Sequence, residues 1–256
     1  MTMPLAITLA ESAPEAAPFV LRNSFNSGIR EAAAIGFDAV ELHAPDPARL
    51  DLGMIERCSV QYGIAIGSLG TGMAASQDGL TLVHVDSERR VEAAKRMRGF
   101  IDIGARFGSV VIVGLIRGLA RDCGGRSEYM ARLRPAMSEL LGHAEKQEVT
   151  LVLEAVNRYE SDVFNTVLET SGFIAGYGSD RLKLHVDTFH MNIEEANVAD
   201  SLRAAAGVVG HVHIADSNRL APGQGHFDFK GTVATLADIG YSGLLSVECL
   251  PLPTPY

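Results

Sequence analysis

The feature that most constrains the fold is a repeated unit, which consists of a short apolar run, a loop and a longer amphipathic stretch. The unit recurs about every 30 residues, the usual length of a strand–helix–strand repeat. Short apolar runs between turn residues are typical of buried strands, and apolar side chains three or four positions apart are typical of helices. Strict alternation of the two favours a parallel sheet covered by helices.

Eight strands are predicted, at Leu5 to Leu9, Ala39 to His43, Ile64 to Leu69, Val110 to Leu115, Thr150 to Ala155, Leu182 to Asp187, Val209 to Ala215 and Leu244 to Cys249. Helices are predicted between them, at Ser24 to Ile35, Leu50 to Tyr62, Ser87 to Phe107, Ser127 to Gln147, Phe164 to Tyr177, Ile193 to Ala206 and Lys230 to Ile239. This order predicts an α/β fold, a single (β/α)8 TIM barrel domain over residues 1–256, with a doubly wound open sheet as the alternative.

The sequence also carries signals for the ends of these elements. Gly36, Gly63 and Gly108 are placed to terminate helices, and Ser87 is a candidate N-cap. The polar segment Gly70 to Asp86 is too long for an ordinary loop of such a barrel, which indicates a functional loop. The last strand is followed by a short proline-rich tail ending at residue 256, so the barrel is expected to lack its eighth helix. A covering partner subunit or a longer natural protein would account for that.

Charge and composition exclude several classes of protein. A formal net charge of −9 argues against broad nucleic-acid binding, which requires clustered Lys and Arg. No apolar run approaches the roughly 20 residues needed to span a bilayer, and no signal peptide is recognisable. The 3 cysteines are widely spaced, which fits a reducing compartment and argues against a thiolate zinc site. The protein is therefore expected to be cytoplasmic, away from membranes and nucleic acids.

Polar residues end four consecutive predicted strands, at Glu154, Asp187, His213 and Glu248. They are one strand–helix unit apart, so in a closed barrel they converge at the carboxyl-terminal rim. Strand alternation turns their side chains inward. Three converging carboxylates repel one another unless a cation or shared protons compensate them. A carboxylate-rich set with one imidazole suits Mn²⁺, Mg²⁺ or Co²⁺ better than a structural zinc.

Three further polar residues follow these strand ends at short spacing. Glu160 lies beyond Glu154, His190 beyond Asp187, and Arg219 beyond His213. They are close enough to sit on the loops above a metal, where they would contact substrate hydroxyls or an anionic end; solvent-facing loop residues are the alternative. His185 and His211 share the inward parity and lie deeper, so we interpret them as interior histidines satisfied by their neighbours.

Five segments resemble the ketose 3-epimerase branch of the xylose isomerase-like TIM barrels: EAVNRYE (154–160), DTFHMNIEE (187–195), HIADSNR (213–219), GHFDF (225–229) and VECLPLP (247–253). Within that branch the chain is most similar to 5-keto-L-gluconate epimerases, because of GTG (70–72), DGL (78–80) with His84, and GLIRG (114–118). The resemblance implies one divalent metal ion, Mn²⁺ first, held by Glu154, Asp187, His213 and Glu248. It also implies substrate contacts by Glu160, His190 and Arg219. We separately expect a homo-oligomer, either a dimer or a tetramer.

The implied reaction inverts a carbon next to the carbonyl of a ketose or keto-sugar acid. Glu154 and Glu248 would flank that carbon, one removing a proton and the other returning one to the opposite face through an enediolate. His84 and Arg117 are candidates for the distal end of the substrate, and Arg117 would suit a carboxylate.

Several other activities stay open at this point. They are aldose–ketose or keto-polyol isomerisation, keto-acid lyase or decarboxylase chemistry, and a non-catalytic sugar- or metal-binding barrel. A three-zinc apurinic endonuclease of the same fold is disfavoured by the acidic charge and by the lack of a histidine in GLIRG.

Overall fold

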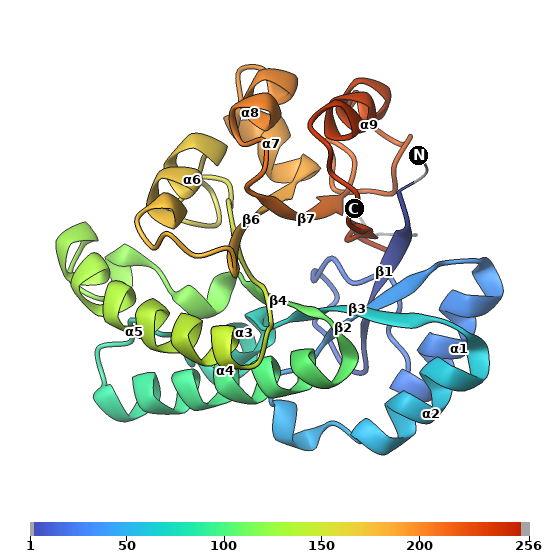
Figure 1. Cartoon of the computed structure of the whole chain (residues 1–256), viewed down its shortest axis with the longest axis horizontal. Coiled ribbons are helices and arrows are strands. Elements are labelled where there is room, and N and C mark those ends of the chain that lie inside the picture. The colour runs from blue at the N-terminus through green and yellow to red at the C-terminus, as the bar shows by residue number, and fades with distance from the viewer. Residues whose placement is uncertain (1–2, 252–256) are drawn as a thin grey trace.

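The computed structural model describes residues 3–251 as a closed barrel of eight parallel strands in the order β1 to β8 (Figure 1). The predicted TIM barrel is therefore confirmed, and the open sheet is excluded because β1 pairs with β8. The strands are β1 (Leu5–Ala10), β2 (Ala39–His43), β3 (Ala65–Gly70), β4 (Val110–Val113), β5 (Leu151–Glu154), β6 (Leu182–Asp187), β7 (Val209–Ile214) and β8 (Leu245–Val247).

Helices surround this ring on its outside (Figure 1). The α-helices are α1 (Phe25–Ile35), α2 (Leu52–Tyr62), α3 (Gly72–Asp78), α4 (Ser87–Phe107), α5 (Arg126–Lys146), α6 (Val167–Ala175), α7 (Thr188–Glu194), α8 (Val198–Ala204) and α9 (Phe229–Asp238). Short 3₁₀ turns are η1 (Pro47–Arg49), η2 (Leu115–Arg117) and η3 (Ala120–Asp122). Within residues 3–251 no helix follows β8; the tail at 252–256, on which the prediction of a missing eighth helix depends, lies outside the described residues.

Capping explains most helix ends. Gly36, Gly63 and Gly108 have positive φ angles of 103°, 65° and 69° and end α1, α2 and α4, as predicted. The N-cap of α4 is Asp86 rather than Ser87, because the carboxylate of Asp86 accepts the backbone N–H of Glu88.

Two segments differ from the sequence prediction. The predicted loop at 70–86 contains the short helix α3. The helix predicted at 193–206 is two helices, because Glu195 is extended with ψ of 127° and separates α7 from α8. Each has its own cap: Asp187 accepts the N–H of Phe189, and Asn197 accepts that of Asp200. A side chain that ends a strand thus also begins a helix.

The apolar core lies between the barrel and the helices. Leu151 and Leu153 of β5 are fully buried in it, whereas Val152 and Glu154 face the barrel interior, as the alternation predicted. Unlike the branched aliphatic layers common in such barrels, this interior is largely polar. Its buried side chains include Thr8, Glu41, Ser68, His185, His211 and Ser246. Burying polar groups costs folding free energy unless they are hydrogen-bonded, so these side chains need specific partners inside the barrel.

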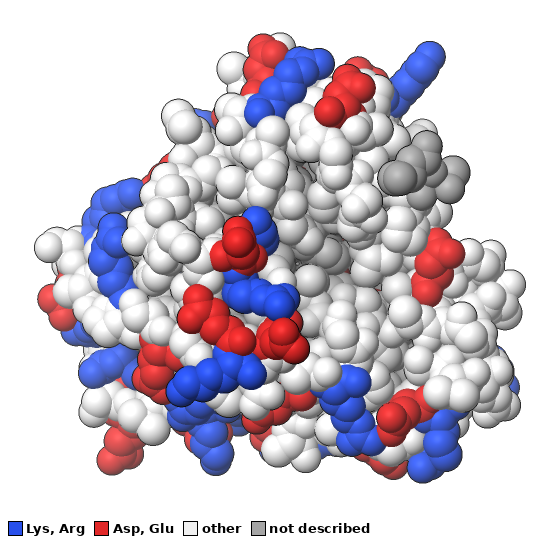
Figure 2. Space-filling model, viewed as in Figure 1, with Lys and Arg blue, Asp and Glu red and all other residues white. Residues whose placement is uncertain are grey.

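Charged side chains of both signs are interspersed over the face seen in Figure 2. The cluster of Arg and Lys on α4 forms ion pairs: Arg96 with Asp78 and Glu92, and Arg98 with Glu139. These basic side chains are therefore paired with acids on the helix surface, which agrees with the low expectation of nucleic-acid binding. Among the described residues, no helix combines the length and apolarity that crossing a bilayer would require.

Candidate active site

Four of the predicted site residues meet at the carboxyl-terminal rim of the barrel. Glu154 ends β5 and Asp187 ends β6. His213 lies on β7, and Glu248 follows β8 directly. None of the four side chains belongs to a residue more than 9% exposed. The carboxyl ends of parallel strands therefore gather three carboxylates and one imidazole in a buried group.

His213 lies between the carboxylates of this group. One ligand atom each from Glu154, Asp187 and His213 lie within 4.8 Å of one another. On its other side, the Nδ1 of His213 is 3.4 Å from the Oε2 of Glu248. Parallel pairing of the strands thus brings the other three predicted ligands close to the ring of His213.

Two buried atoms of this group lack a hydrogen-bond partner. Asp187 accepts the N–H of Phe189 through Oδ1 at 2.8 Å, but its Oδ2 is unpartnered, as is Nδ1 of His213. Buried polar atoms without partners are rare and call for an explanation such as an ion. Oxygen donors with one imidazole are what Mn²⁺ and Mg²⁺ bind, so the residues fit a divalent cation.

The carboxylates also carry the electrostatic strain that a cation would relieve. Burial, and then the charge of Glu248, raises the pKa of Glu154 to about 8. The same two causes raise the pKa of Asp187 to about 6. For Glu248 burial acts in the same direction, but His213 and Arg219 outweigh it and lower the pKa to about 2. One carboxylate of the flanking pair is therefore held ionised, while the other favours its proton.

The three predicted substrate contacts lie beside this group, where Arg219 bonds Glu160 directly and His190 is linked to Glu160 through Asn157. The guanidinium of Arg219 donates to Glu160 at 2.7 Å and lies 3.7 Å from Glu248. The side-chain amide of Asn157 donates to Glu160 at 3.0 Å and bonds the Nδ1 of His190 at 2.7 Å. The Nε2 of His190 then points to Glu154, at 3.6 Å. Asn157, which links two of them, was not predicted.

These residues line a cavity of about 330 Å³. Six of the predicted site residues contribute to its lining, which also includes the apolar side chains of Pro14, Pro18, Phe19, Met73 and Leu115. Among residues 3–251, Arg219 is the only Lys or Arg in that lining, and it is already paired with Glu160. The cavity therefore offers both hydrogen-bonding groups and uncharged apolar surface.

A family described as the xylose isomerase-like TIM barrel matches residues 29–256. The chain belongs to this family. An L-ribulose 3-epimerase of Mesorhizobium japonicum is 36% identical over 218 residues, covering 83% of this chain and 71% of that protein. A D-psicose 3-epimerase of Agrobacterium fabrum is 27% identical, covering 88% of this chain and 78% of that protein.

Solved structures agree with these relatives. The D-allulose 3-epimerase from Methylomonas sp. in complex with D-allulose is 28% identical, with a TM-score of 0.80 over 97% of this chain and 85% of that one. Within its family the chain is thus a sugar epimerase of the ketose 3-epimerase group, with a buried Glu/His cluster that fits a metal site.

Two predicted site residues of this ketose 3-epimerase homologue lie away from the cavity. Arg117 is buried and donates to the carbonyls of Gly114 and Val163 and to Ser161, so it holds two loops together. His84 accepts the backbone N–H of Asp86 through Nδ1. Neither side chain lines the cavity, because the direction of a loop residue is not set by strand parity.

Strand β2 adds two residues that the sequence analysis missed in this epimerase. Glu41 is fully buried, and its carboxylate is bonded by His43, His211 and His213. These three histidines, led in effect by His213, hold its pKa well below the usual range despite burial. His43 lines the cavity. The signal was present, because both residues have the inward parity of the run AVELH.

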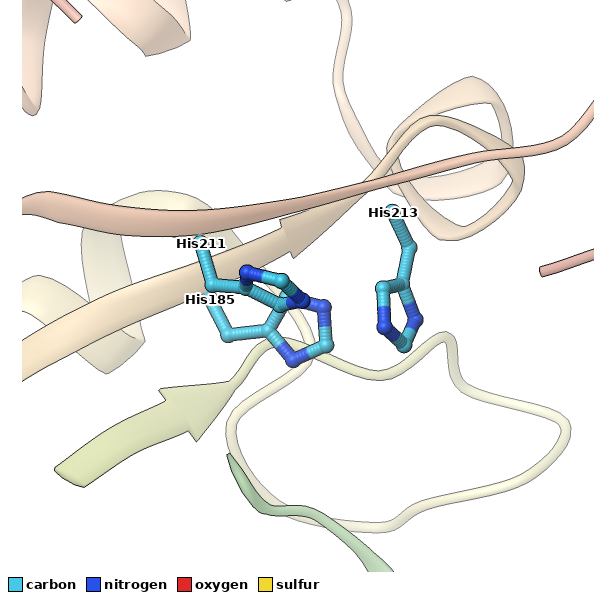
Figure 3. Close-up of side chains that lie close together, drawn as sticks. All are labelled: His185, His211 and His213. Atoms are coloured by element: carbon cyan, nitrogen blue, oxygen red, sulfur yellow. The ribbon is translucent and has the colours of Figure 1, made fainter. Parts of the chain in front are cut away.

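The two deeper histidines, His185 and His211, lie together near His213 (Figure 3), but their hydrogen bonding differs. His211 bonds Glu41 at 2.7 Å, which confirms that a neighbour satisfies it. His185 contradicts the same prediction: both of its ring nitrogens are buried without a partner in the described residues. Its ring instead packs edge-on against His213 at 4.1 Å between centroids. Burial lowers the pKa of His185 well below its usual value, so the ring is neutral packing beneath the site.

Arg219 is positioned by a strained loop. Its φ is 62°, a left-handed conformation that is uncommon for a residue other than glycine. Asp216 organises the loop by accepting the backbone N–H groups of Ser217, Gly223 and Phe227. Such strain persists only where the surroundings enforce it, and here the hydrogen bonds of Asp216 do so.

Proposed function

We propose that this chain is a divalent-metal-dependent 3-epimerase of an uncharged ketose, with L-ribulose and D-psicose as its first candidate substrates. The observation that carries the proposal is that Glu154 and Glu248, the two acids predicted to flank the reacting carbon, meet one metal-ligand group and line one cavity. Relatives that act on these sugars, by their names, support the choice of substrate.

The proposed ligands are Glu154, Asp187, His213 and Glu248, around Mn²⁺, with Mg²⁺ or Co²⁺ as alternatives. When bound, the ion supplies a Lewis acid that polarises the carbonyl and acidifies the neighbouring C–H. One of the two glutamates, Glu154 or Glu248, removes the proton from that carbon, and the other donates a proton to the opposite face. Two acids are needed because a single base returns the proton to the face it came from. An epimerase runs in both directions, so each glutamate serves as acid and as base.

Above these acids, the hydrogen-bonded set of Glu160, His190 and Arg219 would orient the substrate hydroxyls. Asn157 fixes two of these side chains relative to each other, so their donors and acceptors are positioned before substrate arrives. Preorganised polar groups cost no reorganisation during the reaction.

The charge of the cavity favours a neutral sugar. A carboxylate or phosphate on the substrate would need an unpaired cation, and the only Lys or Arg in the lining is committed to Glu160. The finer assignment to 5-keto-L-gluconate would place an acid in this cavity while Arg117 and His84 lie outside its lining. We therefore rank that keto-acid behind neutral ketoses and include it in the test.

The test is proton exchange in D₂O with the Mn²⁺-loaded protein, using L-ribulose, D-psicose, D-fructose and 5-keto-L-gluconate. Deuterium at C3 together with the C3 epimer as product is the expected result. An aldose product would instead indicate isomerisation, and loss of CO₂ or cleavage would indicate decarboxylase or lyase chemistry. Ligand binding without exchange would leave a non-catalytic barrel and refute the proposed reaction.

A further inference from the structure

The carboxylate of Glu41 is the centre of a buried network beneath the candidate active site. Its Oε1 lies 2.8 Å from the Nε2 of His213 and 2.8 Å from that of His43. Its Oε2 lies 2.7 Å from the Nε2 of His211 and accepts the hydroxyl of Ser68 at 2.5 Å. Glu41 itself has no exposed surface. Four groups therefore converge on this single side chain: two from β7, one from β3 and one from its own strand, β2.

These contacts determine the tautomer of His213. An ionised carboxylate only accepts hydrogen bonds, so the Nε2 of His213 has to be the donor. In a neutral imidazole with the proton on Nε2, the lone pair is on Nδ1. That Nδ1 is the buried, unpartnered atom that faces Glu248 across 3.4 Å. A cation bound at Nδ1 needs the neutral ring, which would then present its lone pair to the ion and its N–H to Glu41.

We propose that Glu41 is a positioning residue which, by accepting the Nε2–H of His213, fixes the ring orientation and tautomer that let Nδ1 bind the divalent cation. The inference rests on the proposed function, because it needs His213 to be a metal ligand. Carboxylates that orient ligand imidazoles are a general device, and their loss costs about 10–100-fold in metal affinity.

Glu41 also connects the ligand to the cavity wall. His43, bonded to the same Oε1 as His213, lines the cavity and packs on Phe19 with ring centroids 4.2 Å apart. Gly70 makes room for this ring, since an added Cβ would lie 2.2 Å from its atoms. The contacts of Glu41 therefore extend from the metal-ligand group to the apolar side of the site.

Glu41→Gln with Ser68→Ala as its matched control tests this role. Gln keeps the volume of Glu41 but brings N–H donors to a place that needs only acceptors. Ser68→Ala removes a buried hydrogen bond to the same carboxylate without touching His213. Free Mn²⁺ followed by electron paramagnetic resonance gives the dissociation constant directly. We expect Mn²⁺ affinity to fall about 10–100-fold in Glu41→Gln, and to be unchanged in Ser68→Ala. Equal affinity in Glu41→Gln and the original chain, or equal losses in both variants, would overturn the proposal.

A second measurement needs no variant and covers a Glu41→Gln protein that does not fold. In the unaltered chain loaded with diamagnetic Zn²⁺, ¹⁵N–¹H correlation of the histidine rings should show His213 carrying its proton on Nε2 alone. A proton on Nδ1 refutes the inference. If the unaltered chain binds neither Mn²⁺ nor Zn²⁺, the metal part of the proposed function fails and the role of Glu41 fails with it. If the unaltered chain binds these ions but the Glu41→Gln affinity or the His213 tautomer is not as expected, only the role of Glu41 is refuted and the proposed function stands.

Discussion

Strands β5 to β8 carry Glu154, Asp187, His213 and Glu248 at or beside their last residues, whereas β1 to β4 end in Ala10, His43, Gly70 and Val113. The second half supplies every proposed metal ligand. The first half supplies space and support: an added Cβ at Gly114, just after β4, would lie 2.6 Å from the Oε2 of Glu154. The second half of the barrel thus holds the proposed reacting groups, and the first half limits the space available to their side chains.

The largest effects should follow changes to the acids of the second half. Glu154→Gln and Glu248→Gln, measured at saturating Mn²⁺, should each lower kcat by about 10²–10⁴-fold, the usual contribution of a positioned acid or base. Each variant keeps one acid, so it should still exchange the C3 proton of one epimer with D₂O. Exchange of both epimers at equal rates in either variant would show that the two glutamates do not act on opposite faces.

Adding one methyl group in the first half of the barrel should also lower kcat, because it would displace Glu154. Gly114→Ala would push on the carboxylate of Glu154, and a displacement of about 1 Å can cost about 100-fold in rate. Gly72→Ala is the matched control, because Gly72 also lines the cavity but its Cβ would make ordinary contacts from 3.7 Å. Steady-state kinetics of the two variants check this. Similar kcat values for both would mean that the first half does not constrain Glu154.

Removing the side-chain amide of Asn157, in the second half of the barrel, should have a smaller effect on kcat/KM. Asn157→Ala leaves Glu160 and His190 without a shared partner, and losing such a buried bond costs about 1–3 kcal/mol, or about 5–150-fold in kcat/KM. Asn165→Ala is the control, since Asn165 bonds the carbonyls of Val156 and Ser161 in the same loop but neither of those side chains. If the control loses as much kcat/KM as Asn157→Ala, the loop as a whole, and not the Asn157 contacts, is responsible.

The smallest effect concerns stability rather than rate. Glu154, with its pKa raised to about 8 in the metal-free protein, holds its proton more tightly when folded than when unfolded. Its ionisation therefore opposes folding, and the contribution of Glu154 to the stability of the metal-free protein declines as pH rises from about 4.5 towards 8. Bound Mn²⁺ removes that cost, so the rise in Tm on adding Mn²⁺ should be larger at pH 8 than at pH 5. A fixed excess of about 100 times Kd adds about 2.7 kcal/mol, or roughly 5–10 °C.

That prediction is checked by thermal melts at the two pH values, each with Mn²⁺ at the same multiple of the Kd measured at pH 8. Glu195→Gln is a suitable control, because Glu195 lies outside the cavity lining and its Oε1 and Oε2 bond Val167 and Ser201 instead. A Tm increase that is the same at pH 5 and pH 8 would contradict the assigned role of Glu154.

The two halves of the barrel also differ in how many of their site residues could be predicted from the sequence. Glu154, Asp187, His213 and Glu248 were accessible because strand parity and unit length are local properties that a closed barrel converts into proximity. Glu41 obeys the same parity but lies in the middle of its strand, where only the folded barrel brings His213 to it. The strand-end criterion could not find it.

Loops account for the other differences. Arg117 was expected at the substrate because it follows a strand, yet its guanidinium is buried in bonds to Gly114, Ser161 and Val163. Glu195 interrupts a helix that its neighbours favour, since its carboxylate bonds the N–H of Val167 and the hydroxyl of Ser201. In both places long-range hydrogen bonds outweigh local preference, and no periodic pattern encodes them.

The polar interior of the barrel has a consequence for attempts to make this enzyme more heat-resistant. Exchanging Glu41 and all four groups bonded to it for aliphatic residues of similar volume would remove a buried charge and its polar partners together, a change that is often neutral or stabilising. Such a barrel would keep or gain stability, but it would have lost His213 and with it the proposed metal ligand. Selection for thermal resistance alone would therefore enrich inactive proteins, and a useful screen has to score metal retention alongside survival of heat.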